Sequence, residues 1–186
     1  LPSVSKTGYT FAGWTGSNGA TAQTTVTISK GSTGNKTYTA NWTADTYTIK
    51  FNANNGTGTT ASVTATYDST VKLTANGFSR AGYTFKGWST SALKTATGAN
   101  HANSATLTAS QVNNYYTTVK KGGTLNLYAV WELNDLTKSS EAGYTGTYDG
   151  VNHNISFVAS HGSALTISYQ WYKSGTAIAN ATSTTY

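Results

Sequence analysis

Short runs in which apolar and polar residues alternate recur along the chain, separated by polar turn residues. A period of two residues is the pattern of a β-strand with one buried face. In residues 47–51, Tyr47, Ile49 and Phe51 fall on one face, and Asn55-Gly56 follows as a hairpin signal. The other strands predicted between residues 45 and 133 cover 62–67, 71–75, 83–88 and 124–131, with Val63, Ala65, Tyr67, Leu125, Leu127, Ala129 and Trp131 facing inward.

Alternation also predicts strands before and after this stretch. Near the start of the chain we expect strands at 9–12 and 24–29, the second with Val26 and Ile28 inward, separated by a polar loop at 15–22. A closing strand at 36–43 places Tyr38, Ala40 and Trp42 on one face. After residue 140 the pattern predicts a strand at 165–173 with a buried Trp171, a turn at 174–176 and a further strand from Ala177.

The alternating pattern contains an internal repeat. The nine residues from Lys6 to Trp14 recur from Arg80 to Trp88, with the skeleton basic-x-Gly-Tyr-Thr-Phe-x-Gly-Trp. The two copies of this signature lie 74 residues apart, whereas the closing tryptophans, Trp42 and Trp131, lie 89 apart. The second copy therefore holds an insertion, and the chain is a tandem repeat protein.

These observations predict four parts. Residues 1–44 are the C-terminal part of a first repeat, 45–133 a complete second repeat, 134–140 a linker, and 141–186 a partial third unit of different character. We expect the inserted stretch, 89–114, to protrude as a loop or extra hairpin, with a short helical turn near 110–116. The junction at 43–45 is so short that we expect a semi-rigid rod.

Composition narrows the classes of chemistry. Only 10% of the residues are charged, and the chain has neither Cys nor Met, which excludes disulfides and thiol chemistry. The net charge is +6 with scattered basic residues, Lys120-Lys121 being the only adjacent pair, so we expect no nucleic-acid partner. No apolar run is long enough for a membrane span, and we expect any export signal to lie upstream of this sequence.

Candidate catalytic and metal sites are weak. The six carboxylates form no close pair of the kind that glycoside hydrolysis needs, so we expect a protein that is not an enzyme and carries no cofactor. His101, His153 and His161 show no local metal motif and are expected at the surface. A self-made cross-link between Lys and Asn, or between Thr and Gln, stays open, because no motif argues for it or against it.

The aromatic residues divide into two groups. Trp14, Trp42, Trp88 and Trp131 recur at equivalent repeat positions and are expected in the core, because aromatic rings bury the most area per residue. Tyr115 and Tyr116 lie next to each other outside the repeated words. They are the candidate ligand-binding residues, as platforms on which a sugar could stack.

Three segments of the chain resemble a known family. The segments Tyr47 to Gly56, Gly82 to Trp88 and Leu127 to Trp131 resemble, in this order, the Listeria–Bacteroides repeat, the family of the internalin B-repeats. This resemblance implies a small β-grasp-like module without enzymatic activity, strung in tandem on secreted or wall-anchored bacterial surface proteins. The third unit, through Tyr148 to Gly150 and Tyr169 to Gly175, resembles bacterial immunoglobulin-like surface modules, which implies a partial β-sandwich.

The fold expected is therefore all-β, with tandem β-grasp-like repeats followed by a partial Ig-like module. The leading functional hypothesis is a non-enzymatic extracellular segment of a bacterial surface protein, acting as stalk, spacer or fibre-forming adhesin. Its partners would be neighbouring domains of the same chain, a host or cell-wall glycan, or another copy of itself through an open strand edge. The alternatives are a carbohydrate-binding module, with Tyr115 and Tyr116 at its site, and an accessory domain of a large secreted enzyme.

Overall fold

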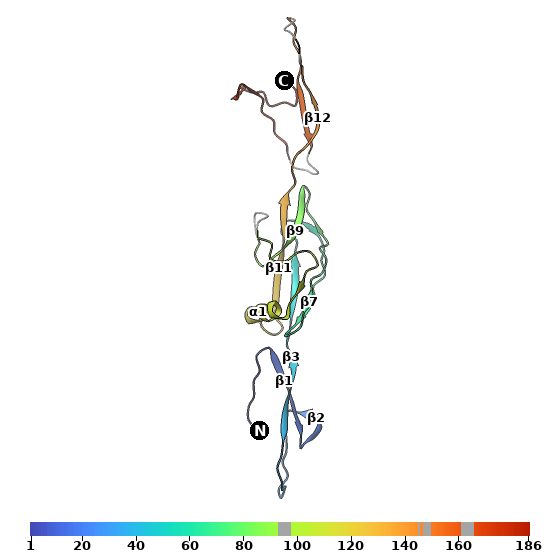
Figure 1. Cartoon of the computed structure of the whole chain (residues 1–186), viewed down its shortest axis with the longest axis vertical. Coiled ribbons are helices and arrows are strands. Elements are labelled where there is room, and N and C mark those ends of the chain that lie inside the picture. The colour runs from blue at the N-terminus through green and yellow to red at the C-terminus, as the bar shows by residue number, and fades with distance from the viewer. Residues whose placement is uncertain (93–97, 145, 147–149, 161–165) are drawn as a thin grey trace.

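The computed structural model describes residues 1–92, 98–144, 146, 150–160 and 166–186, and its fold is β-rich, as predicted. Figure 1 shows the chain drawn out lengthwise, with β1 and β3 toward one end, β9, β11 and α1 in the middle and β12 toward the other end. The secondary structure falls into three units along this line.

The first unit is a three-stranded sheet in the order β2-β1-β3. Its strands are β1 (Tyr9–Gly16), β2 (Gly19–Gln23) and β3 (Tyr38–Ala44). β1 and β3 are antiparallel, and Phe11 lies opposite Trp42 with their ring centroids 5.5 Å apart. The predicted aromatic face of the closing strand is thus confirmed.

The prediction for the middle of this unit was wrong. Residues 15–22 are not a loop, because β1 runs to Gly16 and β2 begins at Gly19, and residues 24–29 form no strand. Ile28 is 56% exposed. Every residue of β2 is exposed, so backbone pairing at the sheet edge defines this strand, and no apolar alternation marks it.

The second unit is built on a mixed four-stranded sheet in the order β6-β4-β11-β9. β4 (Thr46–Asn52) and β11 (Thr124–Leu133) are parallel neighbours at its centre, with β6 (Val63–Thr66) and β9 (Tyr83–Ser89) antiparallel on the outside. The helix α1 (Ala109–Val119) precedes β11. Two short strand pairs complete the unit: β5 (Thr57–Gly58) with β8 (Phe78–Ser79), and β7 (Val71–Lys72) with β10 (Thr106–Leu107).

The core of the second unit contains the residues that alternation placed inward. Tyr47 and Ile49 on β4 and Leu127 and Ala129 on β11 are at most 1% exposed. Trp88 is fully buried. The rings of Phe51, Phe85 and Phe78 surround it, with centroids 4.6, 4.8 and 6.1 Å away. The indole N–H of this tryptophan has no hydrogen-bond partner among the described residues, so its place depends on ring packing.

The insertion was expected to protrude and instead covers the core. The helical turn predicted near 110–116 is the longer α1, which begins with a capping box between Thr108 and Gln111. The helix turns one apolar stripe toward the sheet and buries Val112 and Tyr116. Leu107 on β10, just before the helix, is fully buried in the same core. Residues 93–97 of the insertion lie outside the described residues.

The third unit has two separate hairpin-like pairs in its described part. β12 (Thr137–Ala142) pairs with β13 (Ser156–Ser160), and β14 (Tyr172–Lys173) pairs with β15 (Thr176–Ala177). The predicted turn at Ser174-Gly175 is confirmed, with φ of 47° and 82°, the left-handed conformation that a two-residue hairpin requires.

Other predictions for this region were wrong. The linker is shorter than 134–140, because β12 begins at Thr137 with every side chain exposed, which leaves no alternation to detect. Residues 166–171 form no strand, and Trp171 is half-buried with its indole N–H donating to the Ser183 carbonyl at 2.8 Å. The described residues show no two-sheet sandwich, so the Ig-like identity stays a prediction.

We expect Gly87→Ala to destabilise the second unit strongly. Gly87 has φ of +141°, and an added Cβ would lie 2.5 Å from the His101 carbonyl oxygen. Backbone strain and steric overlap should together lower the free energy of unfolding by about 3 kcal/mol, measured by chemical denaturation. The matched control is Gly122→Ala, where φ is +70° and no atom lies within 4 Å. Its expected loss is only about 1 kcal/mol, and equal losses in the two variants would contradict this account.

Candidate functional site

The first and second units meet at a buried carboxylate. Asp45 is the single residue between β3 and β4, and it is only 6% exposed. Its Oδ1 accepts a hydrogen bond from the Thr10 hydroxyl on β1 at 2.5 Å, and its Oδ2 accepts one from the Tyr116 hydroxyl on α1 at 2.6 Å. The Lys121 Nζ lies 3.7 Å from Oδ1. One side chain therefore joins the first unit to the helix of the second.

The backbone around Asp45 is held from both sides as well. Its N–H donates to the Gly8 carbonyl at 2.8 Å, and its carbonyl accepts from the Tyr67 N–H at 2.9 Å. Gly8 has φ of +76° and packs so closely that an added Cβ would lie 2.4 Å from the Tyr67 ring. Only glycine fits both the backbone conformation and the close approach.

A second, exposed anchor lies beside the first. The Tyr9 hydroxyl donates to Asp68 Oδ2 at 2.6 Å, and the Asn113 amide donates to Asp68 Oδ1 at 2.6 Å. The Lys6 ammonium lies 3.7 Å from the centre of the Tyr9 ring. The repeat signature thus docks on the second unit through its glycine, tyrosine and threonine together.

Both carboxylates of this junction are stabilised in their charged form. The hydrogen bond from Thr10, followed by that from Tyr116, lowers the pKa of Asp45 below its ordinary value, against the opposing effect of burial. The hydrogen bond from Tyr9 likewise lowers the pKa of Asp68. The pKa of Tyr116 rises chiefly because its proton is held by Asp45. At neutral pH the two charged carboxylates accept from neutral hydroxyl and amide donors, and the Lys121 ammonium lies beside Asp45.

The same contacts recur at the end of the second repeat. Asn134 follows Trp131 by three residues, as Asp45 follows Trp42. Its N–H donates to the Gly82 carbonyl at 2.9 Å, and its Oδ1 accepts from the Thr84 hydroxyl at 2.6 Å.

The stacked cation recurs too. The Arg80 guanidinium lies 3.7 Å from the centre of the Tyr83 ring, as Lys6 lies over Tyr9. The repeat signature therefore builds the same terminal structure twice, with a charged acceptor in one copy and a neutral one in the other.

Sequence reasoning predicted a short junction but missed the role of Asp45. The contacts that bury it come from Thr10 and Tyr116, 35 and 71 residues away, which no local pattern reveals. One signal was present: an acceptor side chain stands three residues after each closing tryptophan, and a threonine follows each signature tyrosine.

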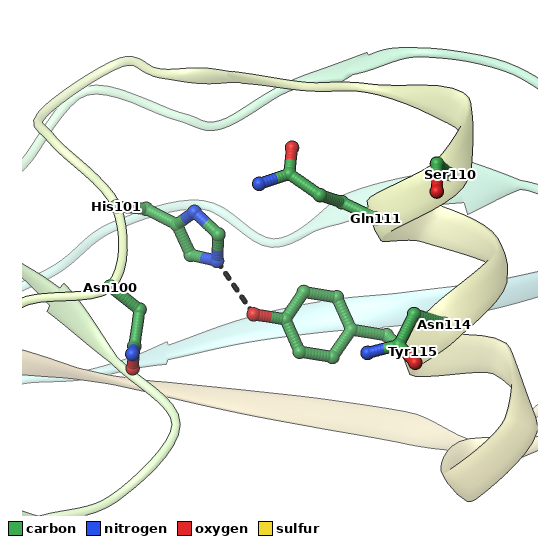
Figure 2. Close-up of a pocket in the computed structure, with 6 residues that line it drawn as sticks. All are labelled: Asn100, His101, Ser110, Gln111, Asn114 and Tyr115. Carbon is green, nitrogen blue, oxygen red and sulfur yellow. Dashed lines mark hydrogen bonds between the residues drawn. The ribbon is translucent and has the colours of Figure 1, made fainter.

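The two candidate ligand-binding tyrosines lie on α1 and separate in space. Tyr116 is 9% exposed and packs edge-on against Tyr67 with centroids 5.1 Å apart, so its ring is not available as a platform and that prediction was wrong. Tyr115 is half-buried, and its hydroxyl lies 2.7 Å from His101 Nε2, as Figure 2 shows. His101 is 7% exposed, so its predicted surface position was also wrong.

Tyr115 and His101 line a surface pocket of about 410 Å³. Burial lowers the pKa of His101 and raises the pKa of Tyr115, so both are neutral at pH 7. The complete lining is Asn100, His101, Ser110, Gln111, Asn114 and Tyr115.

In the described part of the chain, no group of three or more His, Asp or Glu side chains could hold a metal ion. His153 stacks on Tyr144 with centroids 3.5 Å apart, and His161 lies outside the described residues. No helix in that part is long and apolar enough to cross a membrane.

Comparison with known proteins identifies two repeat modules in the chain. Residues 47–130 match the family model of the Listeria-Bacteroides repeat domain, and residues 2–46 match that of the divergent InlB B-repeat domain. The two ranges meet between Thr46 and Tyr47, at the start of β4 and one residue beyond Asp45. No curated protein and no solved structure shows significant similarity. Neither family match extends past residue 130, so the Ig-like resemblance of the third unit is without support from them.

We expect Asp45→Ala to loosen the junction. The change leaves two donors without their charged acceptor and should lower the free energy of unfolding by about 3 kcal/mol. Because the chain has no cysteine, spin labels can be placed uniquely at the exposed Asn35 and Asn126. Pulsed electron resonance should show a narrow distance distribution that broadens in the variant.

The control for this experiment is Asp135→Ala, since Asp135 is exposed and lies outside the junction. It should leave the distance distribution narrow. A distribution that stays narrow in Asp45→Ala would show that the carboxylate does not hold the two repeats together.

The junction should also weaken in acid. A solvent-exposed aspartate has a pKa near 3.9, and the pKa of Asp45 in the closed junction is lower. Near these values the closed form binds fewer protons than the open form, so its stabilisation is complete above about pH 4 and is lost as pH falls through the lowered pKa. The label distances should broaden on acidification, and less so in Asp45→Asn; loosening that begins near pH 6 would contradict this assignment.

Proposed function

We propose that this chain, whose residues 2–46 and 47–130 are repeat modules of the InlB B-repeat and Listeria-Bacteroides type, is a spacer in a bacterial surface protein. Repeats of this kind are typical of bacterial surface or secreted proteins and generally lack catalytic activity. The spacer would hold a neighbouring domain of the same long chain at a fixed distance outside the cell.

The observation that carries this proposal is the path of the chain through the second repeat. The chain passes in through β4 and out through β11, and these strands are parallel neighbours paired from Thr48–Thr124 to Asn52–Tyr128. Because they are parallel, the start of β4 and the end of β11 lie at opposite ends of the sheet, as Figure 1 shows. The repeat thus adds its full strand length to the array.

The same topology favours resistance to pulling. Force applied at Thr46 and Leu133 acts along the strands, so the hydrogen bonds between β4 and β11 are sheared together. Hydrogen bonds that are loaded together break at a higher total force than hydrogen bonds that are loaded one after another. The core side chains of the two strands, including the fully buried Ile49 and Leu127, would have to slide past one another in the same event.

The Asp45 junction supports the spacer function by fixing how one repeat is joined to the next. A flexible linker would let the first unit swing and shorten the reach of the array. Here the link is one residue long and is held by side-chain and backbone hydrogen bonds on both sides. The contacts repeated at Asn134 indicate that the signature serves as a general end structure for these modules.

Two other roles have less support. A fibre-forming adhesin requires pairing of an edge strand with another copy, and an accessory role beside an enzyme requires a catalytic domain elsewhere in the protein. Both stay predictions.

Single-molecule pulling tests the mechanical role of the second repeat. Cysteine handles at Thr46 and Leu133 load β4 and β11 in shear, whereas handles at Thr46 and Thr124 pull the same strands apart from one end. All three positions are exposed, and the chain offers no competing thiol. We expect a clearly higher unfolding force in the first geometry. Equal unfolding forces in the two geometries would contradict the proposal that this repeat is built to bear tension.

A further inference from the structure

We propose that the pocket between α1 and the segment around His101 binds a neutral, polyhydroxylated ligand, namely one or two sugar units of a glycan. This binding function goes beyond the spacer role and does not depend on it. Three features support it: the rigid construction of the pocket, the lack of charge in its lining, and the polar groups left to face a ligand.

The two walls of the pocket are fixed by the fold. On one wall, the backbone N–H of Trp88 donates to the His101 carbonyl and that of Asn100 donates to the Trp88 carbonyl, both at 2.7 Å. On the other wall, the Thr108–Gln111 capping box fixes the first turn of α1. The site is therefore formed before any ligand arrives, which lowers the entropy cost of binding.

The chemistry of the lining selects against charged ligands. All six side chains are amides, hydroxyls, an imidazole or a phenol, and none is Lys, Arg, Asp or Glu. Burial keeps His101 and Tyr115 neutral at pH 7. A phosphate, sulfate or carboxylate would find no cation in this lining, whereas sugar hydroxyls both donate and accept and suit a wall of amides and hydroxyls.

Specific donors are left to face the ligand. The Gln111 Oε1 accepts from the Thr108 N–H at 2.9 Å, which leaves the Gln111 amide NH₂ toward the pocket. The Asn100 Oδ1 accepts from the Thr90 N–H at 3.0 Å, so the Asn100 amide NH₂ is the group that can donate to a ligand. The Asn114 side chain is exposed at the rim beside the Tyr115 ring, as Figure 2 shows.

The size and shape fit a small part of a larger molecule. The volume of about 410 Å³ lies in the lower range of small-ligand sites, which is about 300–1,000 Å³. The half-buried Tyr115 ring offers apolar surface next to the amides, the combination that a sugar ring with its C–H face and hydroxyl edge requires. The pocket lies on the flank of the repeat, which leaves space for the rest of a glycan chain.

Saturation-transfer NMR on the full chain tests this proposal. The probes are neutral sugars: glucose, galactose, mannose, N-acetylglucosamine and their β1,4-linked disaccharides, at millimolar concentration. We expect transfer to at least one of them, and at least a tenfold weaker affinity in Asn114→Ala. A second variant, Ser110→Tyr, fills the pocket from the exposed first turn of α1 and should abolish transfer.

Two controls make the outcome decisive. Asn126→Ala, the same change on an exposed position of β11, should leave binding unchanged. An acidic probe, heparin, should be attracted by the net charge of +6, but that binding should fall with salt and be insensitive to Asn114→Ala. Absence of transfer to every neutral sugar, or transfer that survives Ser110→Tyr, would overturn the proposal. The pulling experiment does not involve the pocket, so the two proposals fail independently.

Discussion

Asp45 carries a charge at a position almost closed to solvent, and this constraint makes each repeat depend on the other. A buried carboxylate is costly unless its lone pairs are taken up by donors. One donor, Thr10, belongs to the first unit, and the other, Tyr116, belongs to the helix of the second. The carboxylate therefore has both hydrogen bonds only when the two units are in place. Bending the chain at this junction would break one of them and leave the buried charge with an unsatisfied oxygen.

The two repeats differ in the residue that accepts the threonine hydrogen bond at their end, which is Asp45 in one and Asn134 in the other. Asp45 and Asn134 accept from the equivalent threonine hydroxyl and donate to the equivalent glycine carbonyl, but only Asp45 is charged. Hydrogen bonds to charged groups are about twice as strong as neutral ones. A change between aspartate and asparagine at this position would thus set how firmly a repeat holds the next module, without altering the fold of the repeat.

The parts of the fold that the sequence predicted are those in which one strand face is buried. Tyr47 and Ile49 on β4 and Leu127 and Ala129 on β11 follow strict alternation because the core demands it. β2 and β12 were missed because none of their side chains is buried, so backbone pairing alone defines them. Recurrence of tryptophan at equivalent positions predicted burial correctly for Trp14, Trp88 and Trp131, whereas Trp42 is only half-buried.

The candidate site was only half predictable, for a geometric reason. Tyr115 and Tyr116 are adjacent in sequence, but successive residues of an α-helix point about 100° apart. Tyr116 therefore turns toward Asp45 and the junction, while Tyr115 turns toward His101 and the pocket. Choosing between these directions requires knowing which side of α1 meets the sheet. On the helix that side is marked only by the buried Val112 and Tyr116, in a stretch with little periodicity.

The placement of α1 also separates the two proposed functions mechanically. Tension along the array would run through β4 and β11, whose ends lie at opposite ends of the sheet. The pocket lies between α1 and the segment that pairs with Trp88, on the flank of this path. Stretching the strands would leave the relative positions of Tyr115 and His101 unchanged until the sheet itself opens. A ligand held there would stay bound under any tension that the repeat withstands.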